Sequence, residues 1–145
     1  MTPDASDINS RRIEKPWGHE VIFTPPGWSH TGKLLFIRAG QRLSLQYHDA
    51  KEEVMCLQSG RALLWLDGPD GEMRSSVMEP SVGHLIGIGR KHRLEALEDS
   101  CVLEVSDPER GNTFRLADDF ARPDETEALR HQPNRGWSGI GRPGV

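Results

Sequence analysis

The chain has 145 residues, which is enough for one domain with one hydrophobic core but too few for two. Its net charge of -4, without a long run of lysine and arginine, argues against a surface that binds nucleic acid. It also lacks an apolar stretch of about 18 residues and a secretion-signal pattern, so we expect a cytoplasmic protein without a membrane partner.

Residues 1–12 are polar and carry no periodic pattern, so we expect a flexible lead-in. The following part, residues 13–122, contains short apolar runs that each end at Gly, Pro, Asp or Ser. These runs lie at 21–23, 33–38, 42–48, 53–58, 61–68, 83–89, 92–97 and 101–105. Closely spaced runs of this kind, without a helical period, predict an all-β fold built as an antiparallel sandwich or barrel.

Residues 123–145 are rich in glycine, proline and charge, a composition that buries too little apolar area to offset chain entropy. We expect a flexible tail there, with a short helix between Leu116 and Leu129 as the one helical candidate. Docking of Trp137 on the barrel or on a partner is the alternative. Cys56 and Cys101 are far apart in apolar runs, which predicts two buried free thiols rather than a disulfide.

Polar residues occupy positions on two strands that alternation places on the inner face. Gln46 and His48 are two residues apart, so their side chains project to the same side of one strand. Glu53 follows a tight turn and shares a face with Met55 on the next strand. His92 must come from a distant strand to join them.

Two imidazoles, one carboxylate and one amide oxygen form a mixed nitrogen and oxygen donor set. Such a set suits one divalent transition-metal ion (Zn, Mn, Fe, Co or Ni) better than Ca or Mg, and it leaves coordination positions open for substrate oxygens. We therefore predict that Gln46, His48, Glu53 and His92 are metal ligands. A polar barrel mouth without an ion is the alternative.

The residues in question read Gly40-x5-Gln46-x-His48-x4-Glu53-x6-Gly60, followed by Gly89-x2-His92. This arrangement resembles the two motifs of the cupin superfamily, except that Gln46 stands where the first histidine is usual. With Lys15-Pro16-Trp17-Gly18 and His92-Arg93-Leu94-Glu95, the chain is similar to the C-terminal domain of type II phosphomannose isomerases. It departs from that subgroup at Leu34, where the subgroup has arginine, and at Gly87-Ile88-Gly89, where it has Pro-x-Gly. The 145 residues leave no room for the nucleotidyltransferase domain of those bifunctional proteins, so we expect no GDP-mannose synthesis from them.

The resemblance implies a small single-domain cupin, a jelly-roll barrel or double-stranded β-helix. It further implies a metal-dependent isomerase or epimerase whose small-molecule substrate is a sugar or sugar phosphate. In this interpretation Arg93 and Lys33 are catalytic or contact substrate. The alternatives are that Arg93 caps the barrel rim and that Lys33 is an ordinary solvated lysine.

Two further expectations concern the surface. Exposed sheet edges favour a cupin-style homodimer, which would cover them. A group of cations at strand ends is predicted to make the barrel mouth basic and to suit a phosphorylated or carboxylated substrate; these are Arg38, Arg42, Arg90 and Lys91. Two functions compete with the isomerase: a non-catalytic module that binds a metal or small ligand, and an iron-dependent dioxygenase.

Overall fold

The structure is a computed structural model that describes residues 10–138. Within this range the chain forms strands β1 (Arg11–Lys15), β2 (Gly18–Ile22), β3 (Thr31–Ile37), β4 (Leu45–His48), β5 (Glu53–Ser59), β6 (Ala62–Asp67), β7 (Met73–Val77), β8 (Gly83–Ile86), β9 (His92–Ala96), β10 (Ser100–Ser106) and β11 (Thr113–Ala117). Two short helices follow, α1 (Glu127–Arg130) and the 3-10 helix η2 (Pro133–Gly136). In the same range no helix is long and apolar enough to span a membrane.

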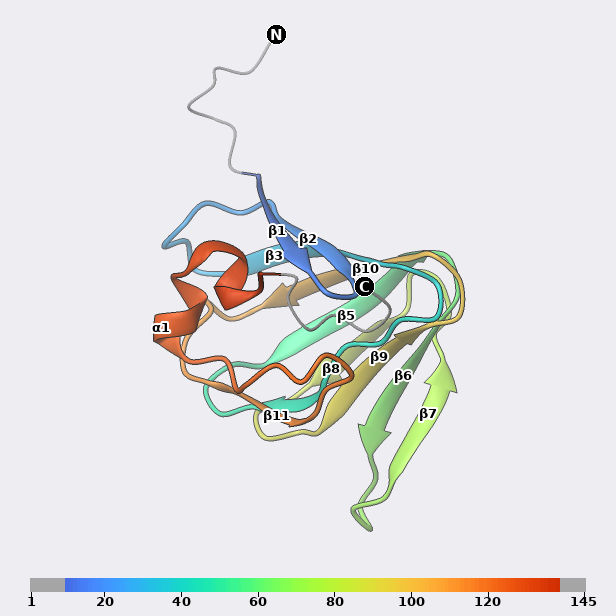
Figure 1. Cartoon of the computed structure of the whole chain (residues 1–145). Helices are drawn as coiled ribbons and strands as arrows, with labels where there is room; N and C mark the ends of the chain where they lie inside the picture. The colour runs from blue at the N-terminus through green and yellow to red at the C-terminus, as the bar shows by residue number, and fades with distance from the viewer. Residues whose placement is uncertain (1–9, 139–145) are drawn as a thin grey trace, which may run out of the picture.

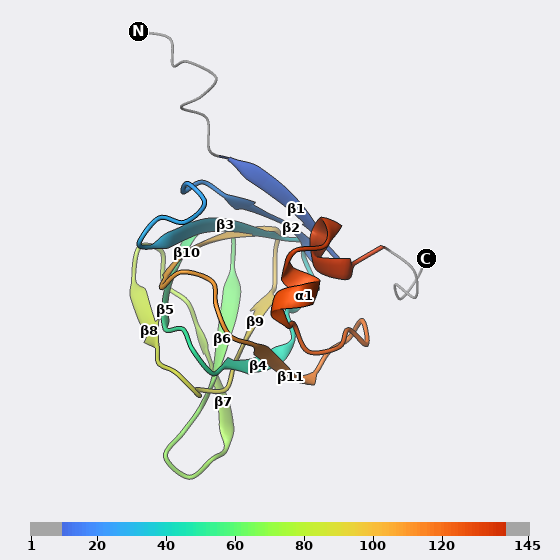
Figure 2. The same ribbon diagram turned by 90° about the vertical axis from the view of Figure 1, so that its left-hand side faces the viewer.

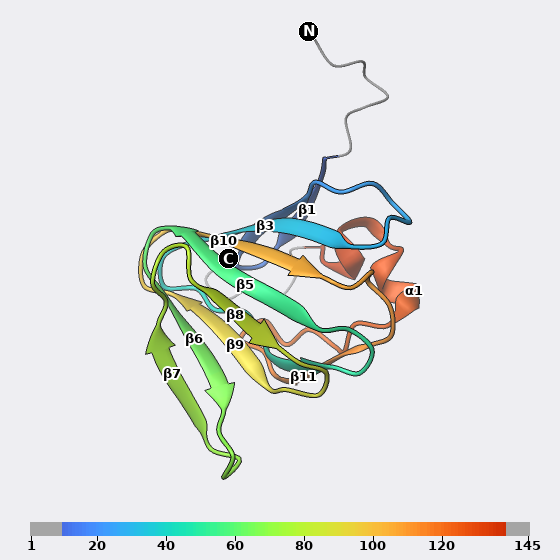
Figure 3. The ribbon, with the colours of Figure 1, turned by 180° about the vertical axis from the view of Figure 1, so that it is seen from behind.

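The strands form two antiparallel sheets. One has the order β1-β2-β3-β10-β5-β8 and the other the order β11-β4-β9-β6-β7. Figures 1 and 3 show the two sheets from opposite sides, and Figure 2 shows how the strands surround a common interior. The predicted all-β barrel is therefore confirmed.

The interior is apolar toward one end and charged toward the other. Along β5 the inward residues run from Leu57 through Met55 to Glu53, and all three are buried. Strand β9 changes in the same way, from Leu94 to His92. The apolar half holds the core, which also includes Trp17 at 2% exposure. The charged half contains the candidate site.

Parts of both segments that we expected to be flexible form regular secondary structure. Strand β1 begins at Arg11, so strand structure starts before residue 13. Residues 123–138 form α1 and η2 instead of a flexible tail, and they lie across one end of the barrel beside β1 and β11 (Figure 2). Trp137 packs against the core, with its ring 6.2 Å from that of Phe120, so the docking alternative is the one observed. Residues 1–9 and 139–145 lie outside the described range.

The two cysteines are free, as predicted, but only half-buried. Cys56 and Cys101 occupy positions on β5 and β10 that alternate with the buried residues, so they face outward from the six-stranded sheet. The expectation of buried thiols was wrong because the apolar runs around them include the outer face of the sheet as well as the core.

Candidate metal centre

Three side chains from three strands meet at the charged end of the barrel. His48 ends β4, Glu53 begins β5 and His92 begins β9, and all three are at least 95% buried. Nε2 of His92 lies 2.8 Å from Oε1 of Glu53, and Nε2 of His48 lies 3.4 Å from the same oxygen. Each residue offers a ligand atom, and these atoms all lie within 4.8 Å of one another.

The hydrogen bonds of the imidazoles fix which nitrogen faces the centre. Nδ1 of His92 lies 2.8 Å from the carbonyl oxygen of Arg90, and a carbonyl can only accept, so this nitrogen carries the hydrogen. Nε2 is then the nitrogen that faces Glu53, and it offers a lone pair to a metal ion when the ring is neutral. Nδ1 of His48 is 3.0 Å from the hydroxyl of Thr113, which permits the same arrangement. Anchored Nδ1 atoms of this kind are typical of metal-binding histidines.

Several atoms at the centre are buried without a hydrogen-bond partner in the described part of the chain. They are Nε2 of His48 and both carboxylate oxygens of Glu53. Buried polar atoms are costly when unsatisfied, and a bound cation would satisfy all three at once. The donor set therefore fits a divalent metal ion.

The local charges keep the carboxylate ionised. Burial raises the pKa of Glu53, but Lys51 and the two imidazoles outweigh it and hold that pKa well below its usual range. Burial lowers the pKa of His48, so this imidazole is neutral and able to bind a metal. Burial alone would lower the pKa of His92. The hydrogen bond and the negative charge of Glu53 outweigh burial, so the pKa of His92 is raised.

Gln46 completes the group as a fourth neighbour. Its backbone pairs with that of His92, and its amide nitrogen lies 3.5 Å from Nε2 of His92. Its amide oxygen accepts a hydrogen bond of 2.7 Å from the hydroxyl of Ser44. Turning the amide by 180° would direct the oxygen toward the centre and keep the bond to Ser44, because a hydroxyl can also accept. All four predicted ligands are thus brought together.

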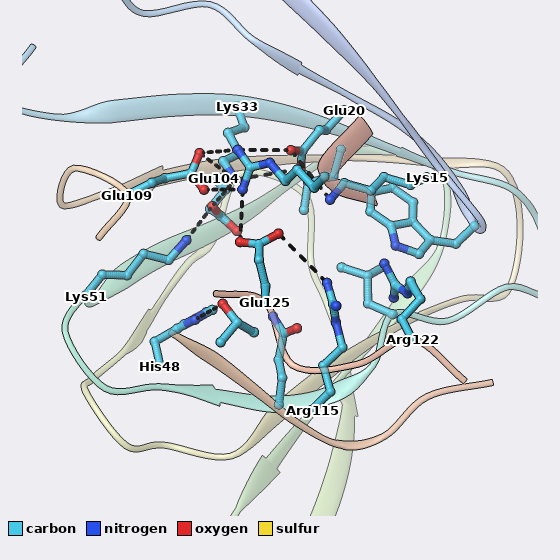
Figure 4. A pocket seen from close by; sticks show the side chains of 16 residues that line it. Lys15, Glu20, Lys33, His48, Lys51, Glu104, Glu109, Arg115, Arg122 and Glu125 are labelled. Atoms are coloured by element: carbon cyan, nitrogen blue, oxygen red, sulfur yellow. Dashed lines mark hydrogen bonds and ion pairs between the residues drawn. The ribbon is translucent and has the colours of Figure 1, made fainter. Parts of the chain in front are cut away.

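A cavity of about 60 Å³ lies beside this cluster and is bordered by Gln46, His48 and Thr113. The rest of its wall is densely charged. Figure 4 shows lysines from separate elements pointing into it, with carboxylates between them; the labelled ones are Lys15, Lys33, Lys51, Glu20, Glu104, Glu109 and Glu125. Charged residues at this density in a barrel interior must be paired to be tolerated.

Lys33 lies in this wall and is 4% exposed, which excludes the solvated-lysine alternative. Its ammonium is 3.2 Å from Glu109 and 3.7 Å from Glu20. Burial would lower its pKa, but these carboxylates outweigh burial and raise it, so Lys33 is a fixed positive charge.

Arg93 is not brought to the cluster. Its Nε donates to the carbonyl of Leu43 at 2.8 Å, and Nη2 donates to the carbonyl of Ala117 at 3.3 Å and lies 3.7 Å from Asp119. As the residue directly after His92 on a strand, it points to the opposite face of the sheet. Its contacts are those of a side chain that ties β9 to the neighbouring strand ends.

The cations that were predicted to make the barrel mouth basic lie elsewhere. Arg38 donates to the carbonyl of Pro16, Arg42 pairs with Asp119, and Arg90 pairs with Asp67. None of the three lines the cavity beside the metal ligands. The cations that do so come from β1, β3, β11, η2 and the loops.

The sequence interpretation missed two charged neighbours of the centre. Nζ of Lys51 lies 3.6 Å from Glu53 and 3.7 Å from Glu104. Burial, together with the charge of Glu53, raises the pKa of Glu104 to about 7. Alternation along β10 does place Glu104 inward, between Val102 and Ser106, so that residue had a sequence signal. Lys51 lies in a turn and had none.

No family model matches the chain, and no curated protein matches it. Solved structures do. KdgF from Halomonas sp. is 16% identical with a TM-score of 0.59, over 74% of this chain and 94% of that one. A variant of oxalate decarboxylase OxdC from Bacillus subtilis is 22% identical with a TM-score of 0.61, over 77% of this chain and 31% of that one. The capsular polysaccharide assembling protein CapF from Staphylococcus aureus is 14% identical with a TM-score of 0.57, over 79% of this chain and 31% of that one.

These are cupin-fold proteins. The chain has the cupin fold. The cupin prediction is thus confirmed at the level of the fold, and the likeness does not single out phosphomannose isomerases. This chain spans about a third of the length of the oxalate decarboxylase and CapF chains. A shared fold supports many activities, so the function must be argued from the site.

Proposed function

We propose that this cupin binds one divalent transition-metal ion through Gln46, His48, Glu53 and His92 and acts as an isomerase or epimerase on a sugar or sugar phosphate. The observation that carries the metal site is the set of buried atoms without partners, Nε2 of His48 and both oxygens of Glu53. The ion would supply a Lewis acid that polarises substrate oxygens.

The chain's own residues have separable roles in this proposal. Lys51 keeps Glu53 ionised at the centre, and the contacts to Arg90 and Thr113 hold the two imidazoles in position. Lys33 is the predicted catalytic residue that lines the cavity, and its fixed positive charge would stabilise negative charge on the substrate. The backbone contacts of Arg93 support a structural role instead.

The size of the cavity restricts how a sugar could reach the centre. Sites for small molecules usually measure about 300–1,000 Å³, several times the 60 Å³ beside the metal ligands. Arg135 of the C-terminal segment fills much of the space between the carboxylates. Turnover of a sugar would therefore need residues 133–137 to move away from the barrel.

The small, ion-paired cavity favours a second candidate, a non-catalytic module that holds a metal or a small ligand. Substrate-dependent hydrogen exchange distinguishes the two, because an isomerase must remove a proton next to the carbonyl and a binding module does not. Incubation of metal-loaded protein with sugar phosphates in D2O is the corresponding test.

We also propose that the protein is a homodimer. The outward positions of the six-stranded sheet are apolar across neighbouring strands, and several are well exposed: Val54 at 38%, Val105 at 44% and Leu85 at 62%. The patch continues through Leu34, Phe36, Cys56, Cys101 and Leu103 and contains no charged side chain. An uncharged apolar face can pack against the same face of a second copy, as two sheets in a sandwich, without charge repulsion.

A further inference from the structure

A second cavity, of about 200 Å³, lies beneath the C-terminal segment, next to the one beside the metal ligands. Among the residues between 10 and 138 that line it, four are cations, Lys15, Arg115, Arg122 and Arg135, and none is Asp or Glu. The same four cations also line the inner cavity, so the two spaces share a wall. The outer space is therefore a positively charged pocket in a protein whose overall charge is negative.

Two of the four cations are already neutralised by strong partners. Arg122 forms a two-pronged pair with Asp118, at 2.9 and 3.1 Å. Arg135 forms another with Glu109, at 2.5 and 2.7 Å. These two side chains have little capacity left for a ligand.

Lys15 and Arg115 have weaker partners and can still donate hydrogen bonds to a ligand. The side chain of Lys15 is 93% buried, and Glu20, which lies 3.9 Å from its ammonium, is shared with Lys33 and Arg135. Arg115 is 90% buried; one terminal nitrogen donates to the carbonyl of Pro123, the other is 4.0 Å from Glu125, and Nε has no hydrogen-bond partner in the described chain. Figure 4 shows Lys15, Arg115 and Arg122 on the side of the cavity away from His48.

Burial of Lys15 and Arg115 disfavours their charged forms, and this lowers the pKa of both side chains. Burial lowers the pKa of Lys15 to about 8. Burial, with Arg122 close by, lowers the pKa of Arg115 to about 10. A buried cation is disfavoured until an anion accompanies it, so an entering anion would gain charge-assisted hydrogen bonds and relieve this cost.

We propose that the outer cavity is a binding site for a small anion with a carboxylate or phosphate group, held by Lys15 and Arg115. A volume of 200 Å³ holds about seven water molecules at ~30 Å³ each, which is room for such a group with a few further atoms. Phe120 and Trp137 add an apolar wall against which the rest of the ligand would pack. The identity of the ligand rests on the proposed function: for a sugar isomerase, an anion site here means that the substrate is an acidic or phosphorylated sugar.

The experiment is isothermal titration calorimetry with inorganic phosphate and, separately, with D-gluconate as a carboxylate. The two arms show which group the site takes. We expect Lys15→Gln and Arg115→Gln to weaken binding at least about tenfold, because each removes a charged donor. Arg74→Gln, an exposed change on the hairpin of β6 and β7, is the matched control and should bind as the wild type does. Because Glu20 keeps two other cations, Lys15→Gln should fold even if Arg115→Gln does not.

The same titration in His92→Ala separates this site from the metal. Binding that persists in His92→Ala but falls in Lys15→Gln supports the proposal, even if no isomerase activity is ever found. Binding lost in His92→Ala and kept in Lys15→Gln would place the anion on the metal and overturn it. Absence of binding in the wild type, or equal binding in all variants, would overturn it as well.

Discussion

Arg135 holds Glu109 in a two-pronged ion pair, with distances of 2.5 and 2.7 Å, although the two residues are 26 positions apart. The same guanidinium lies 3.1 Å from Glu125 and 3.8 Å from Glu20. One side chain of the C-terminal segment thus neutralises carboxylates from β2, from the loop after β10 and from the segment after β11. This places Arg135 at the centre of the charged half of the barrel.

Replacing Arg135 should destabilise the protein strongly. Arg135→Gln leaves buried carboxylates short of a cation, and breaking a buried ion pair from one side typically costs about 3–5 kcal/mol. Urea unfolding followed by circular dichroism measures this loss. Arg74→Gln, which breaks an exposed pair with Asp70, should leave the midpoint unchanged. Equal midpoints for Arg135→Gln and the wild type would show that the segment does not dock in solution.

The same network predicts how stability depends on pH. Burial raises the pKa of Glu125, but Arg135, Lys15 and Lys33 outweigh it and bring it to about 2, and the pKa of Glu109 is likewise held well below its usual range. A carboxyl whose pKa is lower in the folded state stabilises the fold above its unfolded pKa, near 4.5, and loses that contribution as pH falls toward the folded value. We expect the unfolding free energy to fall between about pH 4.5 and 2.

Arg135→Gln provides the control for this pH dependence. Without the guanidinium the carboxylates lose the main cause of their lowered pKa, so the variant should lose less stability than the wild type on acidification. Parallel urea titrations at several pH values compare the two. Identical slopes would mean that Arg135 does not set these pKa values.

Metal content should depend on individual ligands. Protein purified without chelators should carry close to one transition-metal ion per chain, and Glu53→Ala or His92→Ala should lower that content sharply, because each removes a donor. Elemental analysis by mass spectrometry provides the measurement. Glu52→Ala, an exposed neighbour of Glu53, is the control and should keep its metal. Full metal content in both ligand variants would refute the site.

The proposed dimer can be tested on the outer sheet face. Val105→Lys places a charge in the middle of the uncharged patch and should convert a dimer to a monomer, because a lysine there would be desolvated on association. Light scattering coupled to size exclusion gives the mass. Val77→Lys, at another exposed valine on the opposite sheet, should not change it. A wild-type protein of monomer mass would rule the dimer out.

The sequence predicted the parts of this molecule that depend on short-range patterns. Strand alternation and turn residues identified the barrel, and the spacing of Gln46, His48 and Glu53 on two consecutive strands, one in each sheet, indicated three of the ligands. Alternation also argues against a catalytic Arg93, since adjacent residues on a strand point to opposite faces. The family resemblance implied that Arg93 is catalytic. In the structure Arg93 points away from the metal ligands, as alternation predicts.

The C-terminal segment could not be predicted in this way. Arg135 sits between Asn134 and Gly136 in a stretch that resembles a flexible tail, and its partners lie on elements distant in sequence. Its docking depends on burying one guanidinium among carboxylates, which leaves no periodic signal. Asn134 and Arg135 have positive φ angles, of 46° and 54°, which residues other than glycine rarely adopt, so the tertiary contacts hold a backbone that local preference disfavours.

The remaining question is the chemistry, and Gln46 bears on it. An oxygenase needs redox-active iron with positions open to both O2 and substrate, which three histidines, or two histidines and a carboxylate, commonly provide. In this cupin-fold barrel an amide occupies one corner of the group formed with His48, Glu53 and His92. An amide oxygen is a weaker donor than imidazole, so a bound ion would stay more Lewis-acidic. That favours polarising a substrate carbonyl over activating oxygen.

The isomerase proposal therefore predicts turnover without oxygen, restored to metal-depleted protein by redox-inert Zn as well as by other divalent ions. With a cognate sugar phosphate, hydrogen on the carbon next to the carbonyl should exchange with solvent deuterium, because the reaction passes through an enediolate. A panel of aldose and ketose phosphates, incubated anaerobically in D2O and followed by NMR, detects this. His92→Ala is the control and should show no exchange, since it lacks a metal ligand. If no compound exchanges while the iron-loaded protein consumes oxygen with another substrate, the protein is an oxygenase. If neither reaction occurs, the small ion-paired cavity is best explained as a non-catalytic binding site.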